Sequence, residues 1–189
     1  IMDLRNSEII AEYDNAENNG LSKLTNSAIM AFRPAFWRMN GFPIKINDLS
    51  ELWRYHDSMH DNRYNWHKEC ISKCNCSKDD LLLLEKISGL IVSFTKELNF
   101  PIISPAQNAL TRAFYQYLRI KEYTDKFKKE KTVFEIGPGT GYLGIFLRLK
   151  GYKYIALEIT QSYYIYQSLL WQFIFKDEYN NGIDPYNNQ

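Results

Sequence analysis

The order of elements expected between residues 133 and 158 constrains the fold of this chain more than any other feature. Residues 133–136 are mostly apolar and predict a buried strand. A turn with a glycine at every second position follows, and a helix should begin near residues 140–142. A second strand is expected over residues 154–157, with Glu158 at its end. This order predicts a parallel strand–helix–strand unit with a nucleoside pocket at the carboxyl edge of its sheet.

The turn has physical properties that suit a ligand. Glycine adopts backbone angles that other residues avoid, and it leaves no side chain between a ligand and the main chain. The first turn of the following helix presents free N–H groups and a positive dipole end, which attract a carboxylate or a phosphate. Glu158 lies 21 residues after Gly137, close to the spacing typical of an acid that binds ribose hydroxyls. A plain strand–helix turn that binds nothing is the alternative.

The glycines fit two kinds of cofactor site. The run from Gly139 to Gly144 satisfies G-x-G-x-x-G, the dinucleotide pattern, so an NAD(P)-dependent oxidoreductase is one alternative. The first glycine of the series is Gly137, however, and Glu135 precedes it by two positions. The pattern from Glu135 through Gly137 and Gly139 to Gly141 resembles the first motif of class I S-adenosylmethionine-dependent methyltransferases.

The resemblance extends to a bacterial family of sugar O-methyltransferases. It is carried by FEIGPGTGYLG at residues 134–144 and EITQSYYIYQ at residues 158–167, and it is specific over about residues 133–172. It implies S-adenosyl-L-methionine as the cofactor and a carbohydrate or glycan-precursor substrate. It also implies that the acid after the second strand, usually aspartate in the family, binds the ribose. The cofactor-binding residues that it implies are Glu135, Gly137, Pro138, Gly139, Thr140, Gly141, Glu158 and Ile159.

Two roles stay open for Glu135. It supports cofactor binding if the resemblance holds in detail, and it caps a backbone amide without touching the cofactor if it does not. The resemblance does not identify the general base, so no catalytic residue is assigned.

The sheet that this resemblance implies has more strands than the sequence supplies. Two strands are recognisable, and 31 residues follow Glu158. We therefore expect an α/β fold with a Rossmann-like methyltransferase sheet truncated after its second strand, so that the chain is a fragment of the enzyme. Residues 1–128 form a mainly helical region, and residues 129–189 begin the S-adenosylmethionine-binding domain. An oligomer or a partner chain would cover the incomplete sheet, and a non-catalytic partner module is a third alternative.

Two helices upstream of the glycine turn have clear start signals. Ser77 and Asp80 form a capping pattern, and apolar residues recur at helical spacing from there to about Leu98. The sequence from Ser104 to Gln107 predicts the start of another helix, with the serine side chain capping free amides.

A third helix is expected after Glu158, with Thr160 or Ser162 as its cap. Its three tyrosines are expected to pack in the protein rather than to stack on a ligand. Gln161 and Ser162 are candidates for the polar edge of a pocket. The three tyrosines are Tyr163, Tyr164 and Tyr166.

All the histidines and cysteines of the chain fall within a short segment. His56 and His60 are four residues apart, so on a helix they share a face and suit one metal ion. The cysteine spacing is not a standard zinc pattern, and we assign no metal ligand. Free thiols beside an aromatic-rich helix, or a histidine base at the substrate site, are the alternatives. The full set is His56, His60, His67, Cys70, Cys74 and Cys76.

Charge and composition exclude several classes of partner. Lys and Arg number 23 and Asp and Glu number 22, so a net charge of +1 does not favour nucleic acid. The longest uncharged run, residues 159–175, is too short and too polar to span a membrane. The three clustered cysteines do not suggest a secreted disulfide framework, and no signal-peptide pattern opens the sequence. We therefore expect a cytoplasmic protein without a membrane span.

Overall fold

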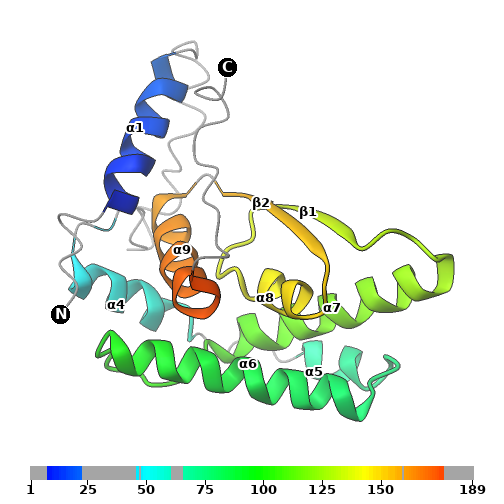
Figure 1. Cartoon of the computed structure of the whole chain (residues 1–189). Helices are drawn as coiled ribbons and strands as arrows, with labels where there is room; N and C mark the ends of the chain where they lie inside the picture. Colours follow the sequence, from blue (N-terminus) through cyan, green and yellow to red (C-terminus); the bar gives the residue numbers. More distant parts are fainter. Residues whose placement is uncertain (1–7, 23–45, 47, 61–65, 159, 177–189) are drawn as a thin grey trace. The chain divides into compact units, whose positions relative to one another are not determined.

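The computed structural model describes residues 8–22, 46, 48–60, 66–158 and 160–176 (Figure 1). The chain divides into two compact units. One comprises Ile1–Tyr55 with Thr160–Gln189, and the other is His56–Ile159. The predicted boundary between residues 128 and 129 falls inside the second unit, where a helix is followed by the first strand, and it stays a prediction.

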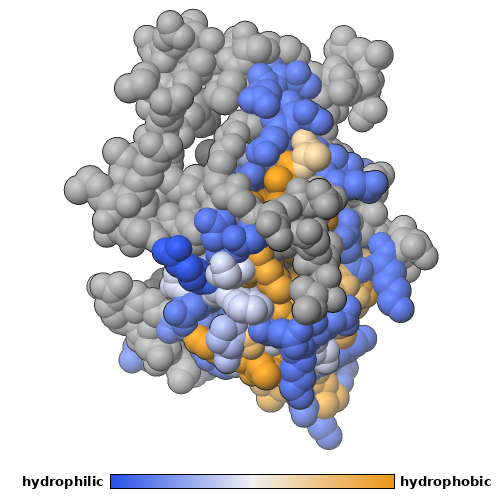
Figure 2. All heavy atoms as spheres, turned by 90° about the vertical axis from the view of Figure 1, so that its left-hand side faces the viewer, coloured by the Kyte–Doolittle hydropathy of each residue, from blue (hydrophilic) through white to orange (hydrophobic). Residues whose placement is uncertain are grey.

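The fold is mixed α/β, as the sequence predicts, and the described strands form a two-stranded parallel sheet. The described elements are α1 (Glu8–Ser22), α4 (Leu49–Ser58), α5 (Trp66–Ile71), α6 (Lys78–Glu97), α7 (Gln107–Phe127), β1 (Thr132–Ile136), α8 (Tyr142–Leu149), β2 (Lys153–Leu157) and α9 (Gln161–Phe175). No described helix combines the length and apolar composition that a membrane-crossing segment needs. On the face shown in Figure 2, hydrophobic side chains reach the surface between hydrophilic ones.

The strand–helix–strand unit has the expected parallel arrangement. Thr132 lies opposite Lys153, and Ile136 lies opposite Leu157, so the two strands are in register along their whole length. The connecting helix α8 contacts both α7 and β2 (Figure 1). Nearly every residue of α8 is buried, because helices and sheet surround an almost wholly apolar sequence. Phe146 on this helix is fully buried and lies 5.5 Å from the Phe114 ring on α7, centroid to centroid.

The prediction that residues 133–136 are buried is wrong for one face of the sheet. Phe134 is 59% exposed and Ile136 is 73% exposed. Their cross-strand partners Ile155 and Leu157 are also exposed, at 47% and 49%. Successive strand residues point to opposite faces of the sheet. The single crossover helix α8 covers only one of these two faces. We call these four residues the apolar sheet face.

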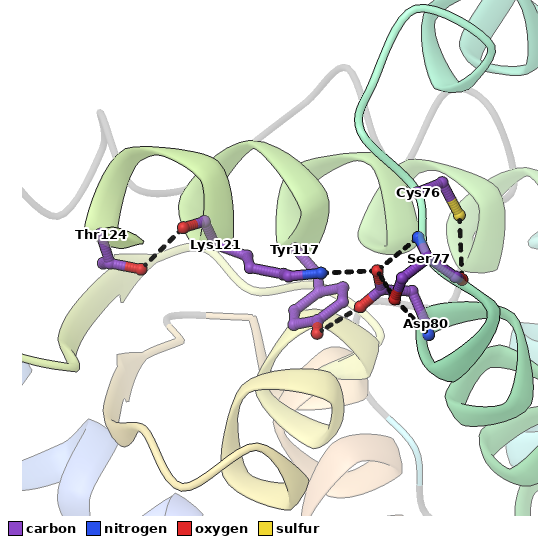
Figure 3. Close-up of polar contacts among 6 residues, drawn as sticks. All are labelled: Cys76, Ser77, Asp80, Tyr117, Lys121 and Thr124. Carbon is purple, nitrogen blue, oxygen red and sulfur yellow. Dashed lines mark hydrogen bonds and ion pairs between the residues drawn. The ribbon is translucent and has the colours of Figure 1, made fainter. Parts of the chain in front are cut away.

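A buried carboxylate joins α6 to α7 (Figure 3). The predicted capping box is confirmed, because the Ser77 hydroxyl accepts from the Asp80 amide at 3.2 Å and Asp80 Oδ2 accepts from the Ser77 amide at 2.9 Å. From α7, the Tyr117 hydroxyl donates to Asp80 at 2.8 Å and Lys121 Nζ donates at 2.6 Å. Burial alone would raise the pKa of Asp80, but these hydrogen bonds outweigh it and hold the pKa well below its usual value.

In the other unit, Gln161 at the start of α9 connects distant segments. Its Nε2 donates to Asp14 Oδ1 at 2.9 Å, and its Oε1 accepts from the Ile46 amide at 2.9 Å. Gln161 is 2% exposed. Because both ends of the side-chain amide bond protein groups, Gln161 is a structural connection in this unit rather than the polar edge of a pocket, for which the sequence made it a candidate.

The tyrosines of α9 pack against other aromatic rings, as expected. Tyr164 lies 5.3 Å from Tyr13 of α1, centroid to centroid. Tyr163 and Tyr166 lie 5.2 and 5.4 Å from Tyr55 of α4. Thr160 occupies the N-cap position of α9, although its side chain makes no capping hydrogen bond with the described residues. Ser162, the other predicted cap, is fully buried.

Candidate functional site

The glycine turn has the backbone geometry that its sequence predicts. Gly137, Gly139 and Gly141 have φ angles of 69°, 60° and 72°, in the left-handed region that favours glycine. The Gly137 amide donates to the carbonyl oxygen of Leu157 at 2.8 Å, which ties the start of the turn to the end of β2. Gly141 is the N-cap residue of α8, so the helix begins directly after the last glycine.

Space beside the first glycine is open. A Cβ atom at Gly137 would meet no atom of the described residues within 4 Å, and the residue is exposed. The glycine is therefore required here by its backbone angle and not by crowding within the described part of the chain. Gly137 is the one glycine of the turn that is exposed in the described part of the chain.

The acid at the end of β2 lies against the turn. Glu158 Oε2 accepts a hydrogen bond from the Gly139 amide at 3.2 Å. The two residues are 19 positions apart, and the parallel pairing of β1 with β2 brings them together. The spacing predicts a carboxylate beside the turn, and Glu158 lies there. The amides of Gly137 and Gly141 donate within the protein, to the carbonyl oxygens of Leu157 and Pro138. Ile159, the last predicted cofactor residue, lies outside the described residues.

A second carboxylate, that of Glu135, belongs to β1 and precedes the turn by two positions. Glu135 Oε2 accepts a hydrogen bond of 2.5 Å from the Tyr154 hydroxyl on β2. Burial raises the pKa of Glu135, and the nearby Glu158 raises it further, whereas the Tyr154 hydrogen bond and the positive charge of Arg112 oppose the rise. Burial and the Glu135 charge together raise the pKa of Tyr154, so its hydroxyl stays a donor at neutral pH.

The two carboxylates determine what the turn can bind. A carboxylate accepts hydrogen bonds from hydroxyl and ammonium groups and repels phosphate. Glu135 and Glu158 interact electrostatically beside the same turn. The helix N-terminus attracts negative charge, but two acids offset that attraction here. The site therefore suits a ligand that carries hydroxyls and a cationic group better than it suits a pyrophosphate.

Two predicted residues support the turn from within. Pro138 is buried, and Thr140 is 5% exposed. Both residues therefore belong to the packed interior beside the turn. Glu135 and Glu158 are only partly buried.

The dinucleotide pattern fits the observed turn poorly. In that pattern the first glycine follows the strand directly, and β1 ends at Ile136. A fingerprint that begins at Gly137 requires its third glycine at position 142, where the chain has a fully buried Tyr142. The Tyr142 hydroxyl accepts from the Ala106 amide at 3.5 Å, so the ring also helps to place the start of α7.

The histidine pair lies at the end of α4 and is bonded to Ser104. His56 Nε2 lies 3.0 Å from the Ser104 carbonyl oxygen, and His60 Nε2 lies 3.1 Å from the Ser104 hydroxyl. The prediction that Ser104 caps α7 is therefore wrong, and Ala106 is the N-cap residue. No local sequence pattern indicates these bonds, because the partners lie 44 and 48 positions apart.

The described residues contain no group of three or more His, Cys, Asp or Glu side chains arranged to hold a metal ion. The His67 side chain lies outside the described residues. The cysteines are free, half-buried thiols, and burial raises the pKa of two of them, Cys74 and Cys76.

No protein-family model matches this chain, and no curated protein or solved structure matches it significantly.

Proposed function

We propose that this chain binds S-adenosyl-L-methionine and serves an O-methyltransferase that acts on a sugar hydroxyl. One observation carries the proposal. The parallel β1–α8–β2 unit holds three left-handed glycines against the carboxylate of Glu158, which bonds the Gly139 amide at 3.2 Å. This combination supports a site for a ribose beside an open main chain.

The chain's own residues have distinct roles in this proposal. Glu158 turns from the Gly139 amide to the ribose hydroxyls, and the freed amide then faces the ligand. Glu135 holds negative charge near the cationic part of the ligand, with Tyr154 fixing its orientation. The cofactor, when bound, supplies a methyl group activated by a positively charged sulfur. Its lack of phosphate suits a turn that carries two acids.

The sugar acceptor rests on the resemblance of residues 134–144 and 158–167 to sugar O-methyltransferases. In the proposed enzyme, the two described strands are part of a larger Rossmann-like sheet.

The test is calorimetric titration of the 189-residue chain with S-adenosylhomocysteine, with NADH as the competing ligand. We expect binding of S-adenosylhomocysteine alone. Glu158→Gln should weaken it at least about tenfold, because one lost hydrogen bond to a charged group is worth about 1.5–3 kcal/mol. Glu97→Gln, a change at an exposed acid at the end of α6, is the matched control. Binding of NADH alone would instead support the oxidoreductase.

The apolar sheet face favours a second candidate, a non-catalytic partner module. Four exposed apolar side chains on a two-stranded sheet are the kind of surface that another chain covers. This candidate predicts a concentration-dependent dimer without affinity for S-adenosylhomocysteine. Sedimentation velocity of the wild type and of Ile136→Lys tests it, because a charge on this face should abolish such a dimer.

A further inference from the structure

Ser104, His60 and the main chain of His56 form a hydrogen-bonded chain that the glycine turn does not use. The Ser104 Oγ lies 3.1 Å from His60 Nε2. The other ring nitrogen, His60 Nδ1, lies 2.9 Å from the carbonyl oxygen of His56. A hydroxyl, a base within hydrogen-bond reach and a third group that orients the base are the parts of an activated nucleophile.

The partners determine which nitrogen of His60 carries the proton. A carbonyl oxygen only accepts hydrogen bonds, so Nδ1 must be the donor to His56. In the neutral imidazole, Nε2 then has a free electron pair, and the Ser104 hydroxyl donates its proton to it. The serine proton is therefore already directed at the atom that would remove it.

Several contacts hold this geometry in place. His56 Nε2 donates to the Ser104 carbonyl at 3.0 Å, which fixes the serine backbone. The His56 ring meets the rings of His60 and Phe100 edge to face, at 4.6 and 4.7 Å. Burial, and then the neighbouring His60, lower the pKa of His56 to about 4, so it stays neutral at pH 7 and places no positive charge beside His60.

The reacting side chains are accessible, and the supporting one is not. Ser104 and His60 are half-exposed, whereas His56 is 1% exposed. Ser104 lies two residues before Ala106, the N-cap of the 21-residue helix α7. Ala106 itself makes no side-chain capping hydrogen bond. The positive end of the helix favours negative charge that develops near Ser104.

We propose that Ser104 is a nucleophile activated by His60 and that it reacts with carboxylic esters. The Ser104 Oγ forms a bond to the ester carbonyl carbon while its proton passes to His60 Nε2. The ester C–O bond then breaks, and His60 returns the proton to the departing alkoxide, which leaves as an alcohol. Water, deprotonated by His60, attacks the acyl-serine, releases the carboxylic acid and restores the Ser104 hydroxyl.

The test uses p-nitrophenyl acetate and the whole 189-residue chain. We expect a burst of p-nitrophenolate of up to one equivalent, with the acetyl group located on Ser104 by peptide mass spectrometry. Ser104→Ala should abolish the burst. Ser93→Ala is the matched control, because the exposed Ser93 hydroxyl donates to the Gly89 carbonyl at 3.0 Å and not to a histidine.

The role of His60 is tested separately from folding. His60→Gln keeps a hydrogen-bonding side chain but cannot take a proton, so acetylation of Ser104 should slow at least about 100-fold. In His60→Ala, added imidazole should restore part of the rate, which a purely structural histidine would not permit. Circular dichroism and thermal unfolding verify that each variant is folded. Acetylation of Ser104 no faster than that of Ser93, or an unchanged rate in folded His60→Gln, would overturn the proposal.

Discussion

Asp80 concentrates the polar contacts between α6 and α7 in one buried side chain. It accepts hydrogen bonds from Ser77, Tyr117 and Lys121. Asp80→Asn removes the charge that compensates the Lys121 ammonium, so we expect the free energy of unfolding to fall by about 2–4 kcal/mol at pH 7. Urea denaturation measures this change. Asp79 is an exposed neighbour on the same helical turn. Asp79→Asn should lower the free energy of unfolding by less than about 0.5 kcal/mol.

The same carboxylate predicts a dependence on pH. The folded-state pKa of Asp80 lies below the unfolded-state value, because its hydrogen bonds favour the charged form. Its stabilising contribution is therefore complete above the unfolded-state pKa of about 4 and is lost as the pH falls below it. The difference in unfolding free energy between wild type and Asp80→Asn should shrink between about pH 4 and pH 2. A difference that grows in acid would contradict this assignment.

Glu135 offers a direct test of the polar contact inside the candidate cofactor site. Burial raises its pKa, and the hydrogen bond from Tyr154 counteracts the rise. Tyr154→Phe removes that bond and leaves the burial, so the pKa of Glu135 should rise further. An NMR titration of the side-chain carboxyl measures the shift, with Tyr123→Phe, at a 55% exposed tyrosine, as the control. A lower pKa in Tyr154→Phe would show that the hydroxyl is not the group that stabilises the carboxylate.

At the scale of the element, replacing glycine by alanine should have opposite effects on stability at two positions. Gly137 and Gly89 both leave room for a Cβ among the described residues, but only Gly137 has a positive φ, of 69°. Gly137→Ala should therefore destabilise by about 1–2 kcal/mol through backbone strain alone. Gly89→Ala, inside helix α6, should stabilise by about 0.5–1 kcal/mol. Thermal unfolding of the two variants gives the signs, and equal signs would contradict the turn geometry.

The elements that the sequence predicts well are those whose signals are local. The capping box of Ser77 and Asp80 spans four residues, and the glycine turn spans five. The start of α7 was mispredicted because the Ser104 hydroxyl bonds His60, 44 positions away. The apolar residues at 133–136 indicate a strand but do not indicate which of its faces a helix covers. The exposure of Ile136 was therefore not predictable. The position of Glu158 was predictable, because parallel pairing fixes the end of one strand beside the other.

At the scale of the whole molecule, the two compact units differ in how their parts are joined. The unit His56–Ile159 is built from consecutive elements around α8. The other unit combines the beginning and the end of the described chain, and Gln161 bonds both Asp14 and the Ile46 amide within it. Contacts between segments so far apart in sequence cost chain entropy to form, so their loss should be felt throughout that unit.

Gln161→Ala tests whether this side chain governs the stability of its own unit. The substitution leaves the buried amide of Ile46 without its acceptor, which costs about 1–3 kcal/mol. The backbone amides of α1 and α9 should therefore exchange their hydrogens faster, because local opening of these helices becomes easier. Exchange in α7 and α8, which belong to the other unit, should stay close to that of the wild type. Gln172→Ala, at an exposed position on α9, should change neither group of helices. Equal acceleration in both units would instead mean that the chain opens as one cooperative body, and that the division reflects compactness without independent stability.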